Sequence, residues 1–399
     1  MNNQFDNNGF DNSSADNNCE SNSENNSENN CENVTESSSV QTDGINADVE
    51  ALMTFEEQSD EAAWDAEIPR AVDIAKERRT FSRLGIGLSV FTLIVLVSSF
   101  ILQMLVLYLI PDFYTTTLFQ NMLAPVCIYV IALPVLLIFI GRMDRSAPVK
   151  NHMGFGAWML ILLICFGFMY IGSYLGNFIM MMFSQASGYD YNNALNTLID
   201  YDKLWISAIF LVIVAPIGEE FIFRKLIIDR MGKYGCEVSV LVSGFTFGLM
   251  HGNFYQFFYA FALGCILAYV YYCTGRVWLT IAIHAVINFV GGVLTAYMQR
   301  GMDAYYADME GLEEGALGLD LIIKHGGTIV AMLLYLIFTF GTMICAIVLP
   351  IVLRKKIKVD KGEVQLPEFD KYAIVFGNVG MILMIVVFGI EFILNLIPA

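Results

Sequence analysis

The chain has 399 residues, of which 56% are hydrophobic and only 15% are charged. This composition is typical of a polytopic membrane protein and excludes an ordinary soluble globular domain. The formal net charge of −17 comes from residues 1–67, which hold 17 of the 39 acidic residues and no lysine or arginine. The remainder is neutral, with 22 acidic and 22 basic residues, and we expect no nucleic-acid partner.

Residues 1–67 form an acidic tail rich in asparagine and serine. Its glutamates recur at every fourth position from Glu20 to Glu36, as on one helical face, but no apolar residues accompany them. We therefore expect this tail to be disordered and solvated. The first residues also lack a basic stretch followed by an apolar run, so we expect no cleavable secretory signal and assign targeting to the first membrane span.

A basic stretch within residues 68–83 directly precedes the first long apolar run. It predicts a cytoplasmic N-terminus, because positively charged flanks stay on that side of the membrane. We predict an all-helical membrane bundle of about nine spans, since each apolar run is long enough, or nearly so, to cross about 30 Å of hydrocarbon. The runs are residues 84–110, 119–141, 156–183, 204–230, 236–254, 256–273, 276–298, 327–353 and 373–397.

The charges of the connecting loops agree with this threading. Lysines and arginines follow the second, fourth, sixth and eighth runs, whereas the intervening loops are poor in both. We therefore expect these basic loops on the cytoplasmic side and the C-terminus outside. The predicted divisions are the tail at 1–67, N-terminal membrane helices at 68–203, a central core at 204–298, and an outer loop with C-terminal membrane helices at 299–399.

The fourth apolar run contains Glu219, Glu220 and Arg224. Ionisable groups inside a membrane are costly and by default mark a functional site, although a network that only fixes helix packing is the alternative. Glu220 and Arg224 are four residues apart with the acid first, which favours an ion pair on one helical face. Glu219 points about 100° away and keeps a free carboxylate. Pro216 removes a backbone donor, so we expect a kink and an unpaired carbonyl at Val212.

Two of the four histidines also lie in apolar runs. Phe247 and His251 are four residues apart, as are His284 and Asn288, so each pair shares a helical face. Either histidine alone could be a packing residue. Counted from the cytoplasmic ends of their helices, the free carboxylate and the two histidines lie at heights of roughly 16, 22 and 12 Å. This shared depth favours one common polar site.

These groups are suited to hydrolysis. A carboxylate in a poorly hydrated pocket can take a proton from water, and imidazole and carboxamide donors can hold that water or stabilise an oxyanion. No serine or cysteine stands beside either histidine motif, which argues against a covalent nucleophile. The pattern therefore favours attack of water on an amide.

Three motifs follow one another on successive apolar runs: Glu219-Glu220-x-x-x-Arg224, Phe247-x-x-x-His251 and His284-x-x-x-Asn288. Together they resemble the CAAX prenyl protease and bacteriocin-processing family of intramembrane endopeptidases. Residues 245–253 and 274–278 are similar to its flanking pattern, and the resemblance covers about residues 204–292. Lys225 stands where many relatives carry a small residue.

The resemblance implies an all-helical membrane endopeptidase that acts on a membrane-associated peptide or protein in the lipid bilayer. In such an enzyme Glu219 would activate water and His251 would position it. His284 and Asn288 would form the oxyanion site. The remaining motif residues would support them: Glu220, Arg224 and Phe247.

Zinc is an alternative cofactor. Two histidines and a carboxylate can bind zinc with an open water position, which here would use Glu219, His251 and His284. The HExxH motif is absent, however, and Glu219 cannot easily be both ligand and free base. We therefore favour a mechanism without a cofactor.

Two other functions remain open. Paired acids also fit a proton- or ion-coupled transporter, but the chain lacks the repeated broken helices of that class, and transport gives no reason for the His–Asn pair. The same fold could instead serve without catalysis as a bacteriocin-immunity membrane protein. Because every site residue of the family is present, we rank this non-catalytic alternative third, after the peptidase and the transporter.

Overall fold

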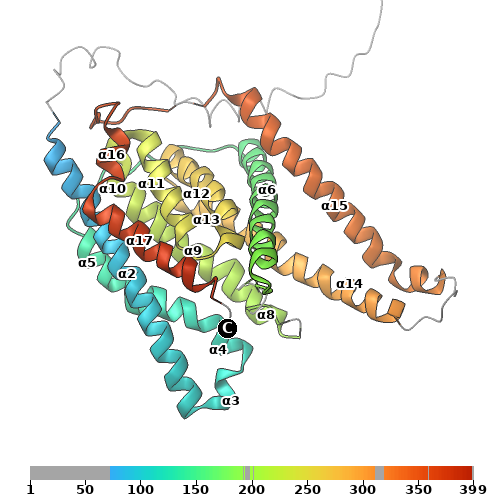
Figure 1. Cartoon of the computed structure of the whole chain (residues 1–399). Coiled ribbons are helices and arrows are strands. Elements are labelled where there is room, and N and C mark those ends of the chain that lie inside the picture. The colour runs from blue at the N-terminus through green and yellow to red at the C-terminus, as the bar shows by residue number, and fades with distance from the viewer. Residues whose placement is uncertain are drawn as a thin grey trace, which may run out of the picture. The chain divides into compact units, whose positions relative to one another are not determined.

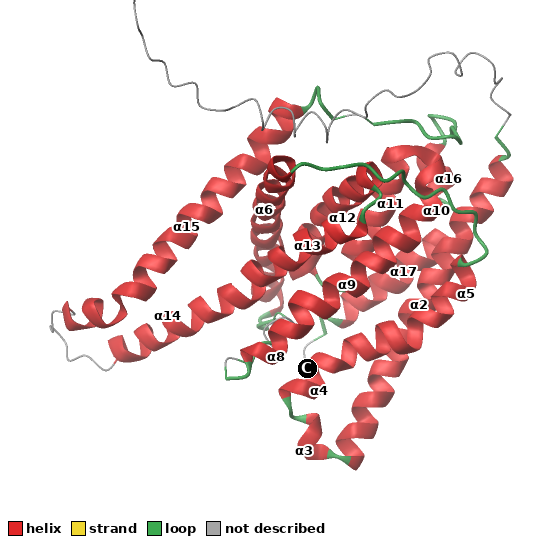
Figure 2. Ribbon diagram, turned by 180° about the vertical axis from the view of Figure 1, so that it is seen from behind, coloured by secondary structure: helices red, strands yellow, loops and turns green. Residues whose placement is uncertain are grey.

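The computed structural model describes residues 72–191, 193, 198–200, 202–310, 319–357 and 359–397, so the predicted tail at 1–67 lies outside the described residues. Within these ranges all regular structure is helical and no strand occurs. The ribbons in Figures 1 and 2 show most of the helices packed side by side, while those at residues 295–310 and 319–353 extend away from the others. The predicted all-helical membrane bundle is confirmed.

Seven segments of the described residues are long and apolar enough to cross a membrane. They are Ile74–Leu109, Thr117–Ile140, Phe155–Ser187, Leu204–Leu249, Phe254–Thr274, Val277–Glu310 and Leu321–Leu353. A shorter apolar helix, α17 (Val379–Leu394), follows them. The count differs from the predicted nine or so because the fourth and fifth apolar runs join into one helical segment, and because the last run yields a helix of only 16 residues.

The segments consist of successive α-, π- and 3-10-helical elements. Before the central core these are α2 (Ile74–Leu109), α3 (Pro111–Tyr114), α4 (Thr117–Pro125), η2 (Val126–Ala132), α5 (Leu133–Ile140) and α6 (Phe155–Ser187). The core contains α8 (Leu204–Ala208), η3 (Ile209–Val214), α9 (Ala215–Glu220), η4 (Phe221–Ile228), α10 (Asp229–Met231), η5 (Gly232–Tyr234), α11 (Gly235–Leu249), α12 (Phe254–Thr274), α13 (Val277–Asn288) and η6 (Phe289–Leu294). After it come α14 (Thr295–Glu310), α15 (Leu319–Leu353), α16 (Lys371–Val375) and α17.

The segment Leu204–Leu249 is not one straight rod, because the chain reverses direction at Gly235. This glycine has a φ of 87°, a left-handed conformation that other residues rarely adopt. Beyond it α11 packs back along η4. The Ser243 hydroxyl donates to the carbonyl of Phe223 over 2.9 Å, and the rings of Phe223 and Phe247 meet edge to face at 5.0 Å. A turn therefore separates the predicted runs at residues 204–230 and 236–254.

Close helix packing depends on glycines that bring backbones together. A Cβ atom on Gly264 of α12 would lie 2.9 Å from the Cα of Gly244 on α11. A Cβ atom on Gly85 of α2 would lie 2.3 Å from the carbonyl carbon of Gly380 on α17. Helix α12 also packs against α6, which in turn packs against α15. Figures 1 and 2 both show α17 lying beside α2.

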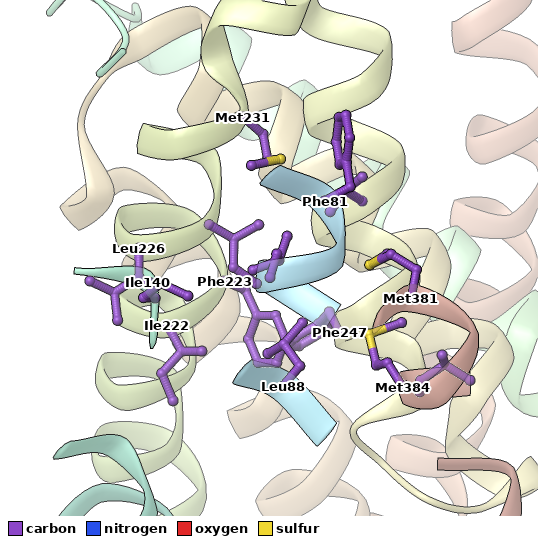
Figure 3. Close-up of a cluster of buried hydrophobic side chains, with 14 of the residues drawn as sticks. Phe81, Leu88, Ile140, Ile222, Phe223, Leu226, Met231, Phe247, Met381 and Met384 are labelled. Atoms are coloured by element: carbon purple, nitrogen blue, oxygen red, sulfur yellow. The ribbon is translucent and has the colours of Figure 1, made fainter. Parts of the chain in front are cut away.

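A hydrophobic core joins α2, α5, the η4–α11 hairpin and α17. Figure 3 shows buried side chains from these elements converging on one another: Phe81, Leu88, Ile140, Ile222, Phe223, Leu226, Met231, Phe247, Met381 and Met384. Phe247 belongs both to this core and to one of the predicted motifs. The apolar core therefore extends directly to the polar site.

Between the predicted runs at residues 276–298 and 327–353, the described residues are helical. Helix α14 continues to Glu310, and α15 already begins at Leu319. Helical spans thus extend past the apolar runs, because polar residues beyond the hydrocarbon do not by themselves end a helix. The boundary predicted between residues 298 and 299 falls inside α14.

Candidate functional site

The helix that carries the carboxylates changes its pitch just before them. The first N–H of α9 donates to the carbonyl of Phe210, five residues back, as in a π-helix. In this register Pro216 would pair with Leu211, but proline has no N–H. The Asn288 amide donates to that carbonyl instead, over 2.8 Å. We expected the unpaired carbonyl at Val212 because α-helical spacing pairs Pro216 with the residue four positions back. In the π-helical turn the pairing is five positions back, so the carbonyl left without its N–H partner is that of Leu211.

Glu220 is fully buried and holds two partners. Its Oε2 lies 3.0 Å from Nε of Arg224, which is also fully buried. Its Oε1 lies 3.0 Å from Nδ1 of His284 on α13. The four-residue spacing therefore produces the expected ion pair, and the pair extends to a histidine of another helix.

The Arg224 guanidinium makes its other contact with an aromatic face. Its central carbon lies 4.7 Å from the centroid of the Phe247 ring, which is cation–π geometry. Within the described part of the chain its nitrogens find no hydrogen-bond partner of good geometry, so the contact with Glu220 is ionic. The Phe247 ring also meets the rings of His251 and His284 edge on, at 5.0 and 5.8 Å. Phe247 thus forms a wall that both histidines and the arginine share.

Glu219 lies outside this closed network. Its side chain is 24% exposed, whereas that of Glu220 is 0% exposed. Its Oε2 lies 3.8 Å from Nε2 of His284. That distance is too long for a direct hydrogen bond and suits a bridging atom. The His284 ring therefore lies between two carboxylates, bonded to one and facing the other.

His251 stands at the turn that follows α11. Its Nδ1 lies 2.8 Å from the carbonyl oxygen of Phe247, one turn back. Because a carbonyl only accepts hydrogen bonds, Nδ1 carries the proton, and Nε2 of the neutral ring is left as an acceptor. The charge of Glu219 acts on this ring. The four-residue spacing of Phe247 and His251 thus fixes the ring orientation.

Two tyrosines that sequence analysis missed border the site. The Tyr129 ring of η2 packs onto Gly218, where a Cβ atom would lie 2.1 Å from a ring carbon, and its hydroxyl donates weakly to the carbonyl of Ala215 at 3.4 Å. The Tyr259 ring of α12 meets the His251 ring edge on, with the centroids 6.5 Å apart. Neither tyrosine has a charged neighbour or a motif spacing in the sequence, so no local signal could identify them.

The remaining hydrogen-bonding capacity of the site limits its chemistry. In the neutral state His284 donates from Nδ1 to Glu220 and accepts at Nε2, so Nε2 can donate only when both nitrogens carry protons. Asn288 uses one amide N–H at Leu211 and retains the other for a ligand. The structure thus joins Glu220, Arg224, Phe247 and His284 through direct contacts and places Glu219 3.8 Å from His284. It also places His251 against Phe247 and anchors Asn288 at the Leu211 carbonyl.

The zinc alternative requires three ligands at one point. In the described residues no three His, Cys, Asp or Glu side chains lie close enough together to hold a metal ion. The set of Glu219, His251 and His284 forms no such group, so these residues do not fit a zinc site in this arrangement. No step below therefore involves a metal.

Comparison with known proteins covers this same segment. Residues 201–290 match the family described as type II CAAX prenyl endopeptidase Rce1-like. We call residues 201–290 the Rce1-like segment, because they are similar to that family. The resemblance predicted from the three motifs is confirmed, and all the motif residues fall inside the match.

Similarity beyond the Rce1-like segment is limited. The candidate membrane peptidase YdiL of Bacillus subtilis (strain 168) is 35% identical over 77 residues, which make up 19% of this chain and 32% of that protein. The chain thus spans about a third of the length of the curated relative it matches. No solved structure matches the chain.

Proposed function

We propose that this protein is an integral membrane endopeptidase of the CAAX-processing type. It hydrolyses a peptide bond of a membrane-associated protein or peptide, with water activated by Glu219. The observation that carries the proposal is the unequal use of two adjacent carboxylates: Glu220 is bound by Arg224 and His284, whereas Glu219 faces His284 across 3.8 Å and is partly exposed. The Rce1-like match supports peptidase chemistry over ion transport.

In the first step of this mechanism, water lies between Glu219 and Nε2 of His251. Glu219 takes one proton as the water oxygen attacks the carbonyl carbon of the substrate, and the electron pair of the C=O bond moves to its oxygen. His284, protonated on both nitrogens, and the second N–H of Asn288 stabilise that oxyanion. A tetrahedral intermediate results.

In the second step, the intermediate collapses. The C–N bond breaks as the oxyanion re-forms a carbonyl, and the proton held by Glu219 passes to the leaving nitrogen. The products are one new carboxyl terminus and one new amine, and Glu219 returns to its ionised form. Glu220 and Arg224 do not exchange protons in this scheme, since their role is to orient His284 from behind.

Substitution of Glu219 by glutamine tests this function. Glu219→Gln keeps the size of the side chain but cannot take a proton, so we expect cleavage to fall at least about a hundredfold. Because the natural substrate is unidentified, the readout is the set of membrane-derived peptides from cells producing each variant, compared by mass spectrometry. Ile217→Leu is the matched control, because Ile217 lies on the same helix and is half exposed.

The expected result is a group of peptides present with the wild type and with Ile217→Leu but absent with Glu219→Gln. All three proteins should reach the membrane in equal amounts, which immunoblotting of membrane fractions checks. Identical peptide sets from the wild type and Glu219→Gln would remove Glu219 from the mechanism.

A further inference from the structure

Helix α17 lies outside the Rce1-like segment but extends to its catalytic region. It packs along α2 at its N-terminal end, where the N–H of Gly380 donates to the Ser82 hydroxyl over 3.0 Å. Its C-terminal end reaches the turn between α11 and α12, which directly follows His251. An element from the far end of the chain thus contacts the backbone next to a site histidine.

The contact centres on Gly252. The amide of Asn395, at the end of α17, donates to the carbonyl of Gly252 over 3.0 Å. One turn earlier, the Glu391 side chain lies so close that a Cβ atom on Gly252 would approach its carboxyl carbon to 2.6 Å. Gly252 also has a φ of 65°, in the left-handed region. A larger residue at position 252 would therefore strain the backbone and would require the Glu391 side chain to move aside.

Aromatic packing anchors this end of α17. Phe392 is buried, and its ring meets those of Phe254 and Phe257, at the start of α12, edge to face at 4.9 and 5.7 Å. This packing holds Asn395 beside the turn, so its amide is already in place to donate to the Gly252 carbonyl.

The other supports of His251 come from its own segment. Its ring bonds the carbonyl of Phe247, and its backbone carbonyl accepts a hydrogen bond from the Asn253 amide at 2.6 Å. The carbonyl of Gly252, one peptide further, accepts from outside the segment. Rotation of that peptide would alter the backbone from which the His251 ring projects.

We propose that Asn395 is a positioning residue for His251, acting through the Gly252 carbonyl, while Glu391 fills the space beside that glycine. This inference rests on the proposed function. Helix α17 then contributes to catalysis, because it holds the turn so that Nε2 of His251 faces the water bound by Glu219.

The test compares Asn395→Leu, which keeps the shape of the side chain but removes the donor, with Ile393→Ala, a control on the exposed side of α17. Both are purified in detergent and assayed on a peptide identified through the Glu219→Gln comparison. We expect kcat to fall about fivefold to tenfold for Asn395→Leu, with KM unchanged, and both values to stay at the wild-type level for Ile393→Ala.

A double-mutant cycle separates positioning from general stability. In a His251→Gln background, Asn395→Leu should cause no further fall in kcat, because the residue it acts through is already gone. A purely structural contact would lower kcat by the same factor in both backgrounds. If Asn395→Leu does not fold, Asn395→Ser, whose side chain is too short to reach Gly252, takes its place.

The outcomes are distinct from those for the proposed function. If Glu219→Gln is inactive but both Asn395 variants match Ile393→Ala, the positioning role is wrong and the peptidase proposal stands. The same holds if the loss persists in the His251→Gln background. If Glu219→Gln retains full activity, the mechanism fails and the role of Asn395 fails with it.

Discussion

At the scale of single residues, one position along a helix separates two chemical roles. Glu219 and Glu220 are neighbours, but the helical rotation between them puts Glu220 against Arg224 and His284 and leaves Glu219 outside that network. The buried carboxylate is neutralised by its partners, so it can orient a ring but not accept a proton from water. On the proposed function, its neighbour Glu219, which has no ion-pair partner at hydrogen-bonding distance, takes that proton.

Loss of Arg224 should therefore affect stability more than loss of Glu219. Arg224→Leu leaves the Glu220 charge buried without the guanidinium beside it, and we expect a cost of about 3–5 kcal/mol in the free energy of unfolding. Thermal unfolding in detergent, followed by light scattering, measures this as a lower melting temperature. Glu219→Gln should have the same melting temperature as the wild type. Equal melting of Arg224→Leu and the wild type would contradict the role given to the pair.

At the scale of helical elements, the sequence predicted what regular spacing controls. The interval between Glu220 and Arg224 predicted their ion pair. The similar depths of Glu219, His251 and His284 predicted one common site, and of these three Glu219 and His284 lie 3.8 Å apart. The predicted catalytic roles of these residues remain part of the proposed function. The π-helical turn before Pro216 was not predictable in this way, because it inserts one residue into the register without a change in the apolar pattern.

Contacts between distant elements were also beyond the sequence. Tyr129 and Asn395 reach the site from helices far from the motifs, through packing that depends on glycines such as Gly218 and Gly252. Such contacts have no local periodicity, since each side chain is an ordinary member of its own helix. Only the three-dimensional arrangement identifies them.

The close approach of α2 and α17 gives a prediction at this scale. A Cβ atom on Gly380 would lie 1.9 Å from the Ser82 carbonyl oxygen, so Gly380→Ala should force the two helices apart at a cost of about 1–3 kcal/mol. Gly389 lies on the same helix with no atom within 4 Å of such a Cβ, so Gly389→Ala should be neutral or stabilise by up to about 1 kcal/mol. Melting temperatures of the two variants provide the measurement. A Gly380→Ala protein as stable as Gly389→Ala would show that the helices do not pack this closely.

At the scale of the whole molecule, span number and charge distribution together define a topology. The helical segment Leu204–Leu249 reverses at Gly235, so it contributes two antiparallel rods to the bundle. We predict that the basic loops after the second, fourth, sixth and eighth apolar runs lie on the same side as residues 68–83, in the cytoplasm. The last of these loops, residues 354–361, holds four lysines and one arginine.

Reporter fusions test this orientation. We expect a reporter that is active only in the cytoplasm to work when it precedes Met1 or is inserted within residues 354–361, and to be inactive when it follows Ala399, because positive loops are retained inside. A reporter that works only outside should give the opposite pattern. Cytoplasmic activity of the fusion after Ala399 would show that α17 does not cross to the other side.

The contact of α17 with both α2 and the turn after His251 has a consequence for biosynthesis. Translation delivers α2 early, and α17 only after every motif residue has been synthesised. Gly380, which packs against Gly85, and Asn395, which donates to Gly252, are therefore both added late. On the proposed function, a nascent chain would carry the whole set of site residues yet remain poorly active until α17 emerged. Order of synthesis would then protect neighbouring membrane proteins from an unfinished protease.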